Sequence, residues 1–102
     1  MKVYISKSDI KGKKYKIVLE YNDGRTKTLH IGSDGMDDYT LTGDDKAKKR
    51  YISRHKSRED WTAKGITTKG FWAYHLLWRF KTKEEAIKKL AEQFNIKIIK
   101  KF

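Results

Sequence analysis

The chain has 102 residues, of which 37% are hydrophobic, 37% are charged and 13% are aromatic. This aromatic content is too high for a disordered segment and suits one small domain spanning residues 1–102. The sequence has no cysteine, so it excludes disulfides and thiolate metal sites and fits a reducing compartment.

The formal net charge of +12 is unevenly distributed along the chain. Residues 1–43 carry a net charge of +2 and residues 44–102 a net charge of +10. Such a lopsided basic field attracts polyanions or acidic protein surfaces, although it also serves solubility alone. No apolar run approaches the roughly 20 residues of a membrane span, and the N-terminal stretch lacks a signal-peptide pattern. We therefore expect a soluble protein that works, or is assembled, inside cells.

Alternation of polar and apolar residues predicts three strands in the first third of the chain. The first is Lys2–Ser6, and the second is Lys14–Tyr21, whose apolar residues recur at every second position. The turn residues 22–24 (NDG) tolerate the positive φ of a tight hairpin. The third strand, Arg25–Ile31, is expected to pair with the second in this hairpin.

The stretch Gly32–Gly43 is rich in glycine and aspartate and is predicted to be a loop, with Tyr39 and Leu41 as anchors. Its acidic residues lack the alternate spacing and closing glutamate of an EF-hand, so a plain loop is favoured over a metal site. These residues are Asp34, Asp37 and Asp38.

A helix is predicted from a cap at Asp44 or Asp45 to about Lys56. One side of this helix is apolar at helical spacing, with Ala47, Tyr51, Ile52 and His55. The opposite side is cationic, and arginines lie at the edge of the apolar side. These basic residues are the candidate contacts for a polyanion or a protein partner: Lys46, Lys49, Arg50, Arg54, Lys56 and Arg58.

The segment Phe71–Phe80 (FWAYHLLWRF) predicts a second helix that is apolar nearly all round, with a polar stripe only at His75 and Arg79. Such a helix is either buried or part of a protein contact, and a small domain has few elements to cover it. The candidate interface residues are Trp72, Trp78 and Arg79. The alternative is that both tryptophans belong to the core.

A capping box at Thr82 and Glu85 predicts a third helix that ends at Asn95. Its apolar side has helical spacing, and Ile96–Phe102 is then expected as a last strand beside an earlier one. The predicted fold class is α+β, in which about three helices pack on a small antiparallel sheet made of the N-terminal strands, the hairpin and the C-terminal strand.

The sequence contains no motif that encodes a reaction or a cofactor site. The three histidines are scattered, and no nucleophile elbow, P-loop, GxGxxG motif or zinc-binding pair is present. A small nuclease that uses His55 with Glu59 or Asp60 remains a distant third hypothesis. We expect no enzymatic activity, no cofactor and no metal.

The block from Arg50 onward contains an unusual motif made of YISRHKSREDW (51–61), GITTKGFW (65–72) and LLW (76–78). Through this motif, and within a stretch of roughly 14–94, the chain resembles a family of small basic proteins encoded by large DNA viruses of eukaryotes. This chain departs from the family pattern after Trp78, where RFK replaces the usual Asn-Lys-Pro.

The resemblance implies a viral setting but no activity. It implies a non-enzymatic virion or minor capsid component that contacts other virion proteins or acidic protein surfaces, with oligomers as an option. Its location would be the virion, and the host cytoplasm or nucleus during assembly. The alternative hypothesis is a basic protein that binds nucleic acid or packages the genome, because cations on one helical side can neutralise phosphates.

Overall fold

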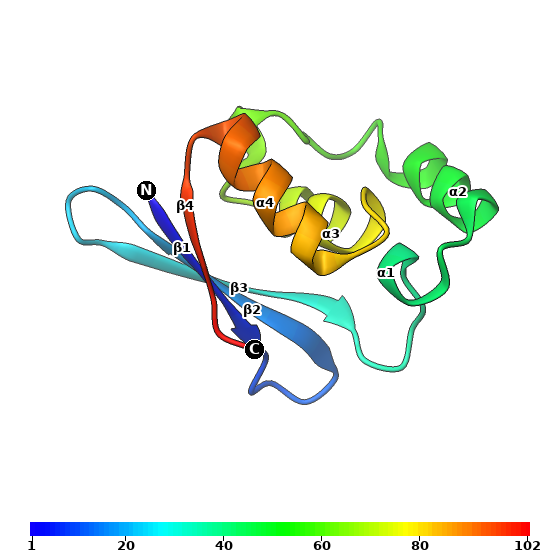
Figure 1. Cartoon of the computed structure of the whole chain (residues 1–102), viewed down its shortest axis with the longest axis horizontal. Helices are drawn as coiled ribbons and strands as arrows, with labels where there is room; N and C mark the ends of the chain where they lie inside the picture. The colour runs from blue at the N-terminus through cyan, green and yellow to red at the C-terminus, as the bar shows by residue number, and fades with distance from the viewer.

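The computed structural model describes all 102 residues as one four-stranded sheet with helices packed on one of its faces (Figure 1). The strands are β1 (Lys2–Lys7), β2 (Lys13–Glu20), β3 (Thr26–Ser33) and β4 (Lys97–Lys100), in the spatial order β3-β2-β1-β4. The expected α+β class is confirmed, and so is the hairpin, because β2 and β3 pair antiparallel across the turn at Gly24.

The sheet is mixed rather than purely antiparallel. The last strand, β4, pairs with β1 in the parallel direction, with Val3 opposite Ile98. The expectation of an antiparallel sheet was therefore wrong at this edge. Alternation along IKIIKKF indicates a strand, but it carries no information about the direction of a neighbouring strand.

The helical elements follow β3 in the chain and precede β4. They are α1 (Tyr39–Thr42), α2 (Asp45–His55), the 3₁₀ turn η1 (Ala63–Gly65), α3 (Lys69–Ala73), the π-helical turn η2 (Tyr74–Trp78) and α4 (Lys83–Phe94). The predicted helix at 71–80 is thus α3 continued by η2, where Arg79 N–H donates to the Tyr74 carbonyl in a widened turn. No helix is long and apolar enough to cross a membrane.

The loop expected at residues 32–43 contains one helical turn, α1. Asp38 caps this turn by accepting the Thr40 N–H at 2.9 Å, and Gly43 ends it in the left-handed region. Tyr39 is the buried anchor that was expected, whereas Leu41 is 63% exposed. Two residues along a helix turn by about 200°, so Leu41 cannot share the buried side with Tyr39.

The core lies between the inner face of the sheet and the segment α3–η2–α4. Helix α4 begins at the expected cap, where Thr82 accepts the Glu85 N–H at 3.1 Å, and ends at Asn95, which has a positive φ. The core consists of 12 buried residues: Val3, Ile5, Ile17, Leu19, Leu29, Ile31, Phe71, Trp72, Leu76, Leu77, Ala86 and Leu90.

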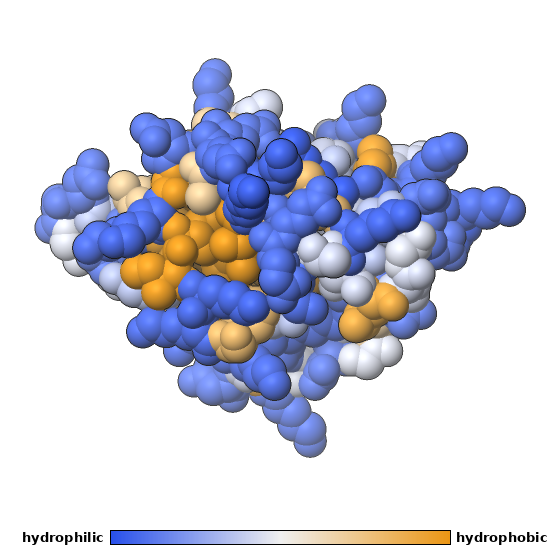
Figure 2. All heavy atoms as spheres, viewed as in Figure 1, coloured by the Kyte–Doolittle hydropathy of each residue, from blue (hydrophilic) through white to orange (hydrophobic).

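All of the helices lie on the same side of the sheet, so its other face is uncovered (Figure 1). Helix α2 lies at the end of the molecule, joined to the sheet through α1 (Figure 1). Figure 2 shows that hydrophilic side chains cover most of the visible surface, including the end that carries α2. The largest apolar area in that view lies near β4.

Candidate nucleic-acid interface

Helix α2 is built by signals at both of its ends. The Asp44 carboxylate accepts the backbone N–H groups of Lys46 at 2.9 Å and Ala47 at 3.2 Å. Asp45 lies in the first turn, and Arg54 and His55 lie in the last. Because the helix dipole favours an anion at the N-terminus and cations at the C-terminus, both arrangements stabilise the helix.

One side of α2 is fixed to the body of the protein by aromatic stacking. The ring of Tyr51 lies between His55 and Trp78, with centroid distances of 4.2 and 4.6 Å. The Lys48 ammonium donates to the Arg79 carbonyl at 2.7 Å. These contacts fix which side of the helix faces solvent.

The solvent side of α2 and the turn that follows it carry the predicted cationic residues without any neutralising partner. All six are exposed, and none forms a salt bridge. The sequence has no acidic residue between Asp45 and Glu59, so no carboxylate interrupts them. We name this surface the α2 cationic face: Lys46, Lys49, Arg50, Arg54, Lys56 and Arg58.

A shallow hollow on this helix is lined by both charged and hydroxyl groups. Lys49 and Lys56 flank Ser53 and Ser57, with Ile52 at one side. Residues 49, 53 and 56–57 recur about once per turn, which places them roughly 5.4 Å apart along the helix. Ammonium and hydroxyl donors spaced in this way suit a row of phosphate oxygens.

The segment after α2 ties that helix to the centre of the molecule. Glu59 accepts from the Trp61 indole N–H at 3.2 Å and lies 3.3 Å from His55 Nδ1. The ring of Trp61 stacks on Tyr74 at a centroid distance of 3.9 Å. His55 and Glu59, two residues of the nuclease hypothesis, thus hold the loop after α2 in place.

Asp60, the other carboxylate of that hypothesis, accepts both the backbone N–H and the hydroxyl of Thr62. These hydrogen bonds lower the pKa of Asp60. The carboxylate therefore holds the start of the turn η1, which begins directly after Thr62.

His75 is buried on the central helix segment and is hydrogen-bonded through both ring nitrogens. Nε2 lies 2.8 Å from the Trp61 carbonyl, and Nδ1 lies 3.2 Å from an Arg79 guanidinium nitrogen. Nε2 therefore carries the proton, and Nδ1 accepts. Burial lowers the pKa of His75 to about 4; the Arg79 charge adds to this shift, and the hydrogen bond to Trp61 opposes it.

The structure gives the three expected interface residues different surroundings. Trp72 is fully buried in the core, and its indole N–H donates to the Ile66 carbonyl at 2.7 Å. Trp78 is half-buried and is stacked on Tyr51. Arg79 is half-buried and donates to Gln93 as well as to His75. The sheet and α4 cover Trp72 in the core, which is the stated alternative for this residue, and the loop after α2 adds Trp61, which stacks on Tyr74.

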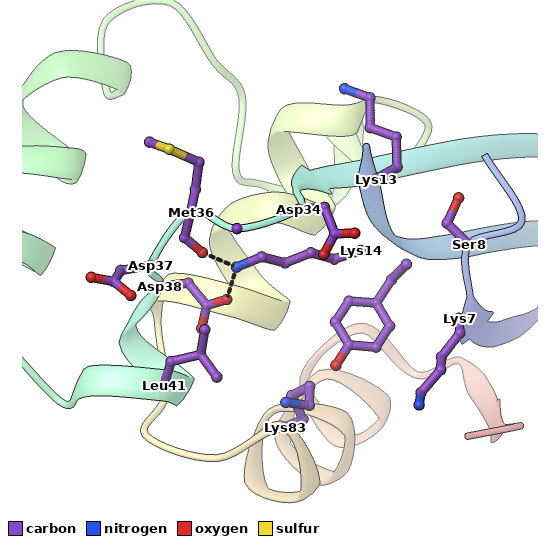
Figure 3. Close-up of a pocket in the computed structure, with 12 residues that line it drawn as sticks. Lys7, Ser8, Lys13, Lys14, Asp34, Met36, Asp37, Asp38, Leu41 and Lys83 are labelled. Carbon is purple, nitrogen blue, oxygen red and sulfur yellow. Dashed lines mark hydrogen bonds and ion pairs between the residues drawn. The ribbon is translucent and has the colours of Figure 1, made fainter. Parts of the chain in front are cut away.

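A second hollow, of about 460 Å³, lies at the end of the sheet near α1 (Figure 3). Lys14 points at Asp38 across it, with Nζ 2.6 Å from the carboxylate, and also donates to the Met36 carbonyl (Figure 3). Both side chains of this pair are largely buried. The charge of Lys14 is therefore neutralised within the protein, in contrast to the charges on α2.

The model of the family of unknown function DUF5754 matches residues 3–55 of the chain. The chain belongs to this family. The matched region covers β1 from Val3 onward, all of β2 and β3, α1 and the whole of α2. It ends at His55, before most of the motif that resembles the viral proteins. No match was found among curated proteins or among solved structures.

Proposed function

We propose that the protein is a non-enzymatic binding protein whose α2 cationic face contacts the phosphates of nucleic acid. The observation that carries the proposal is a helix at the end of the molecule that, with the turn after it, carries six exposed cations with no ion pair and no intervening carboxylate. Phosphate contacts of this kind need charge and access but no base-reading motif.

The shape of α2 suits a duplex. Its 11 residues span about 16 Å, and an α-helix is narrow enough for the major groove of B-DNA, which is about 12 Å wide. The resemblance to small basic proteins of large DNA viruses supports double-stranded DNA as the polyanion. In that setting the protein would be a virion component close to the packaged genome.

A protein contact through Trp72, Trp78 and Arg79 has less support. Trp72 lies in the core, Trp78 is stacked on Tyr51, and Arg79 is hydrogen-bonded to Gln93. An acidic protein surface remains the competing partner for the α2 cationic face, because carboxylates suit the arginine fork as phosphates do.

Duplex DNA binding measured against salt concentration tests the proposal. If Lys46, Lys49, Arg50 and Lys56 each neutralise one phosphate, the slope of log K against log salt should be about −3 to −4. Reversing these four residues to Glu should abolish binding and leave the circular dichroism spectrum unchanged.

The matched control reverses four exposed lysines elsewhere: Lys11, Lys27, Lys88 and Lys89. Each quadruple variant lowers the net charge by the same amount. The comparison therefore separates a direct contact of the α2 cationic face with DNA from the attraction exerted by the net positive charge of the whole protein. Binding that is independent of salt, absent at low salt, or lost equally in both variants would contradict the proposal. Stronger binding to polyglutamate than to DNA would indicate an acidic protein partner instead.

A further inference from the structure

The uncovered face of the sheet is organised around one tyrosine. In the sheet register Tyr4 lies between Val18 of β2 and Ile99 of β4, and Thr28 continues the row on β3. Alternation along each strand places these residues opposite the buried Val3 and Ile5. Tyr4, Val18 and Ile99 are each half-buried, so together they form a flat, partly apolar strip exposed to solvent.

The rows on either side of this strip are basic. Lys2 pairs with Lys97 on one side, and Lys16 lies between Ser6 and His30 on the other. Lys101 places its ammonium 5.1 Å from the centre of the Tyr4 ring. None of these lysines forms a salt bridge. We name them the outer lysines: Lys2, Lys16, Lys97 and Lys101.

Only one carboxylate belongs to this face. Glu20 lies in the row of Lys2 and accepts the Tyr4 hydroxyl at 3.0 Å. That hydrogen bond holds the ring by its hydroxyl group, and the Lys101 ammonium lies over the ring face. This face thus carries four cations and one anion around an aromatic ring that a hydrogen bond keeps in place. Such a surface is complementary to a polyanion that also carries flat rings.

We propose that this open sheet face binds single-stranded nucleic acid, with one base stacked on Tyr4 and the flanking phosphates on the outer lysines. Proteins that bind single strands combine a basic surface along the backbone with aromatic rings on which bases stack. A stacking base would displace the Lys101 ammonium, whose flexible stem allows it to reach the adjacent phosphate. A duplex keeps its bases paired and cannot offer one to the ring.

This inference goes beyond the proposed function, because it concerns another surface and an unpaired strand. The test uses the full chain and a fluorescently labelled dT oligomer, with inorganic polyphosphate as a ligand that has charge but no bases. Tyr4→Ala should weaken dT binding about 5- to 150-fold, the range expected for one stacked base, and should change polyphosphate binding less than twofold. Tyr4→Phe keeps the ring and should keep the affinity.

A second comparison tests the outer lysines, so that the test of the inference does not depend on the Tyr4 variants alone. Lys97→Glu with Lys101→Glu should weaken dT binding more than Lys88→Glu with Lys89→Glu, which makes the same charge change on the exposed side of α4. Equal effects of the two pairs would overturn the inference, as would a Tyr4→Ala variant that binds dT as the wild type does. An equal loss of dT and polyphosphate in Tyr4→Ala would also overturn it, because stacking would then play no part.

The two proposals fail separately. If the reversed α2 cationic face loses the duplex but retains dT binding, each surface has the assigned ligand. If that variant loses both ligands while the Tyr4 and outer-lysine variants lose neither, only the proposed function survives. If the α2 variant loses neither ligand and the sheet variants lose dT, only the sheet-face inference survives.

Discussion

The Nε2 nitrogen of His75 lies 2.8 Å from the carbonyl oxygen of Trp61. This hydrogen bond joins the loop after α2 to the central helix segment. On the other side of the same ring, Arg79 bridges Nδ1 and the Gln93 side chain of α4. His75 thus connects three parts of the chain, and it does so only in its neutral form with the proton on Nε2.

The stability of the protein should fall as the pH is lowered from about 6.5 to 4. Burial lowers the pKa of His75 from 6.5 to about 4 in the folded chain. In that interval the unfolded chain binds a proton that the folded chain excludes, so the stabilisation is complete above pH 6.5 and is lost as the pH falls. The free energy of unfolding should drop by up to about 3 kcal/mol, measured by urea denaturation across this range.

His75→Gln is the control for this pH effect, because its amide can still donate to Trp61 but does not titrate. The His75→Gln variant should lack the loss of stability between pH 6.5 and 4, whereas the His30→Gln variant should retain it. Equal pH profiles for the wild type and His75→Gln would contradict the assignment.

Gly65 should tolerate no side chain. A Cβ at this position would lie 1.8 Å from the Asp60 carbonyl oxygen, and backbone cannot move aside cheaply. Gly65→Ala should therefore lower the free energy of unfolding by at least about 2 kcal/mol. Gly70→Ala is the comparison, because its Cβ would meet only the Glu59 side chain, which can shift without moving any backbone, and the helix gains from alanine. Thermal melts that show Gly70→Ala to be the worse variant would contradict this view of the loop.

Removing one member of the Lys14–Asp38 pair should be costly. The two side chains lie 2.6 Å apart with little exposure to solvent, and Asp38 also caps α1. Asp38→Ala should destabilise the protein by about 3–5 kcal/mol, because it leaves a largely buried ammonium without a partner. Adding Lys14→Met should restore part of this loss. Asp23→Ala breaks the exposed pair with Arg25 and should cost less than about 1 kcal/mol.

Leu90 should be a major contributor to the packing of α4 on the sheet. It is fully buried, and Leu90→Ala should cost about 2–5 kcal/mol in urea denaturation. The exposed neighbour Lys89 provides the control, because Lys89→Ala should change stability by less than about 0.5 kcal/mol. A soluble, undisturbed Leu90→Asp variant would show that this side of the helix is not in the core.

Local signals in the sequence were sufficient for most of the elements. Alternation predicted β1 to β3, and the turn residues predicted the hairpin. The caps at Asp44 or Asp45 and at Thr82 predicted where α2 and α4 begin. These features depend on residues near one another in the chain, so a pattern can indicate them. The exposure of the α2 cationic face followed from the same helical periodicity.

The pairing and packing of segments that are far apart in sequence could not be predicted from any local pattern. The parallel pairing of β4 with β1 and the burial of Trp72 depend on contacts between residues far apart in sequence. An apolar helix looks the same in sequence whether its cover is a partner or its own chain. Here the cover is the chain itself, because the sheet and α4 bury Trp72 and the loop after α2 stacks Trp61 on Tyr74.

The open sheet face could be predicted from the sequence only in part. The alternation around Tyr4 showed that it points away from Val3 and Ile5, but not whether a helix would cover it. The sequence by itself determined which residues share a side of each strand or helix, because backbone geometry sets those periods. The tertiary structure alone decided which of those sides are buried, because burial depends on where the remaining elements pack.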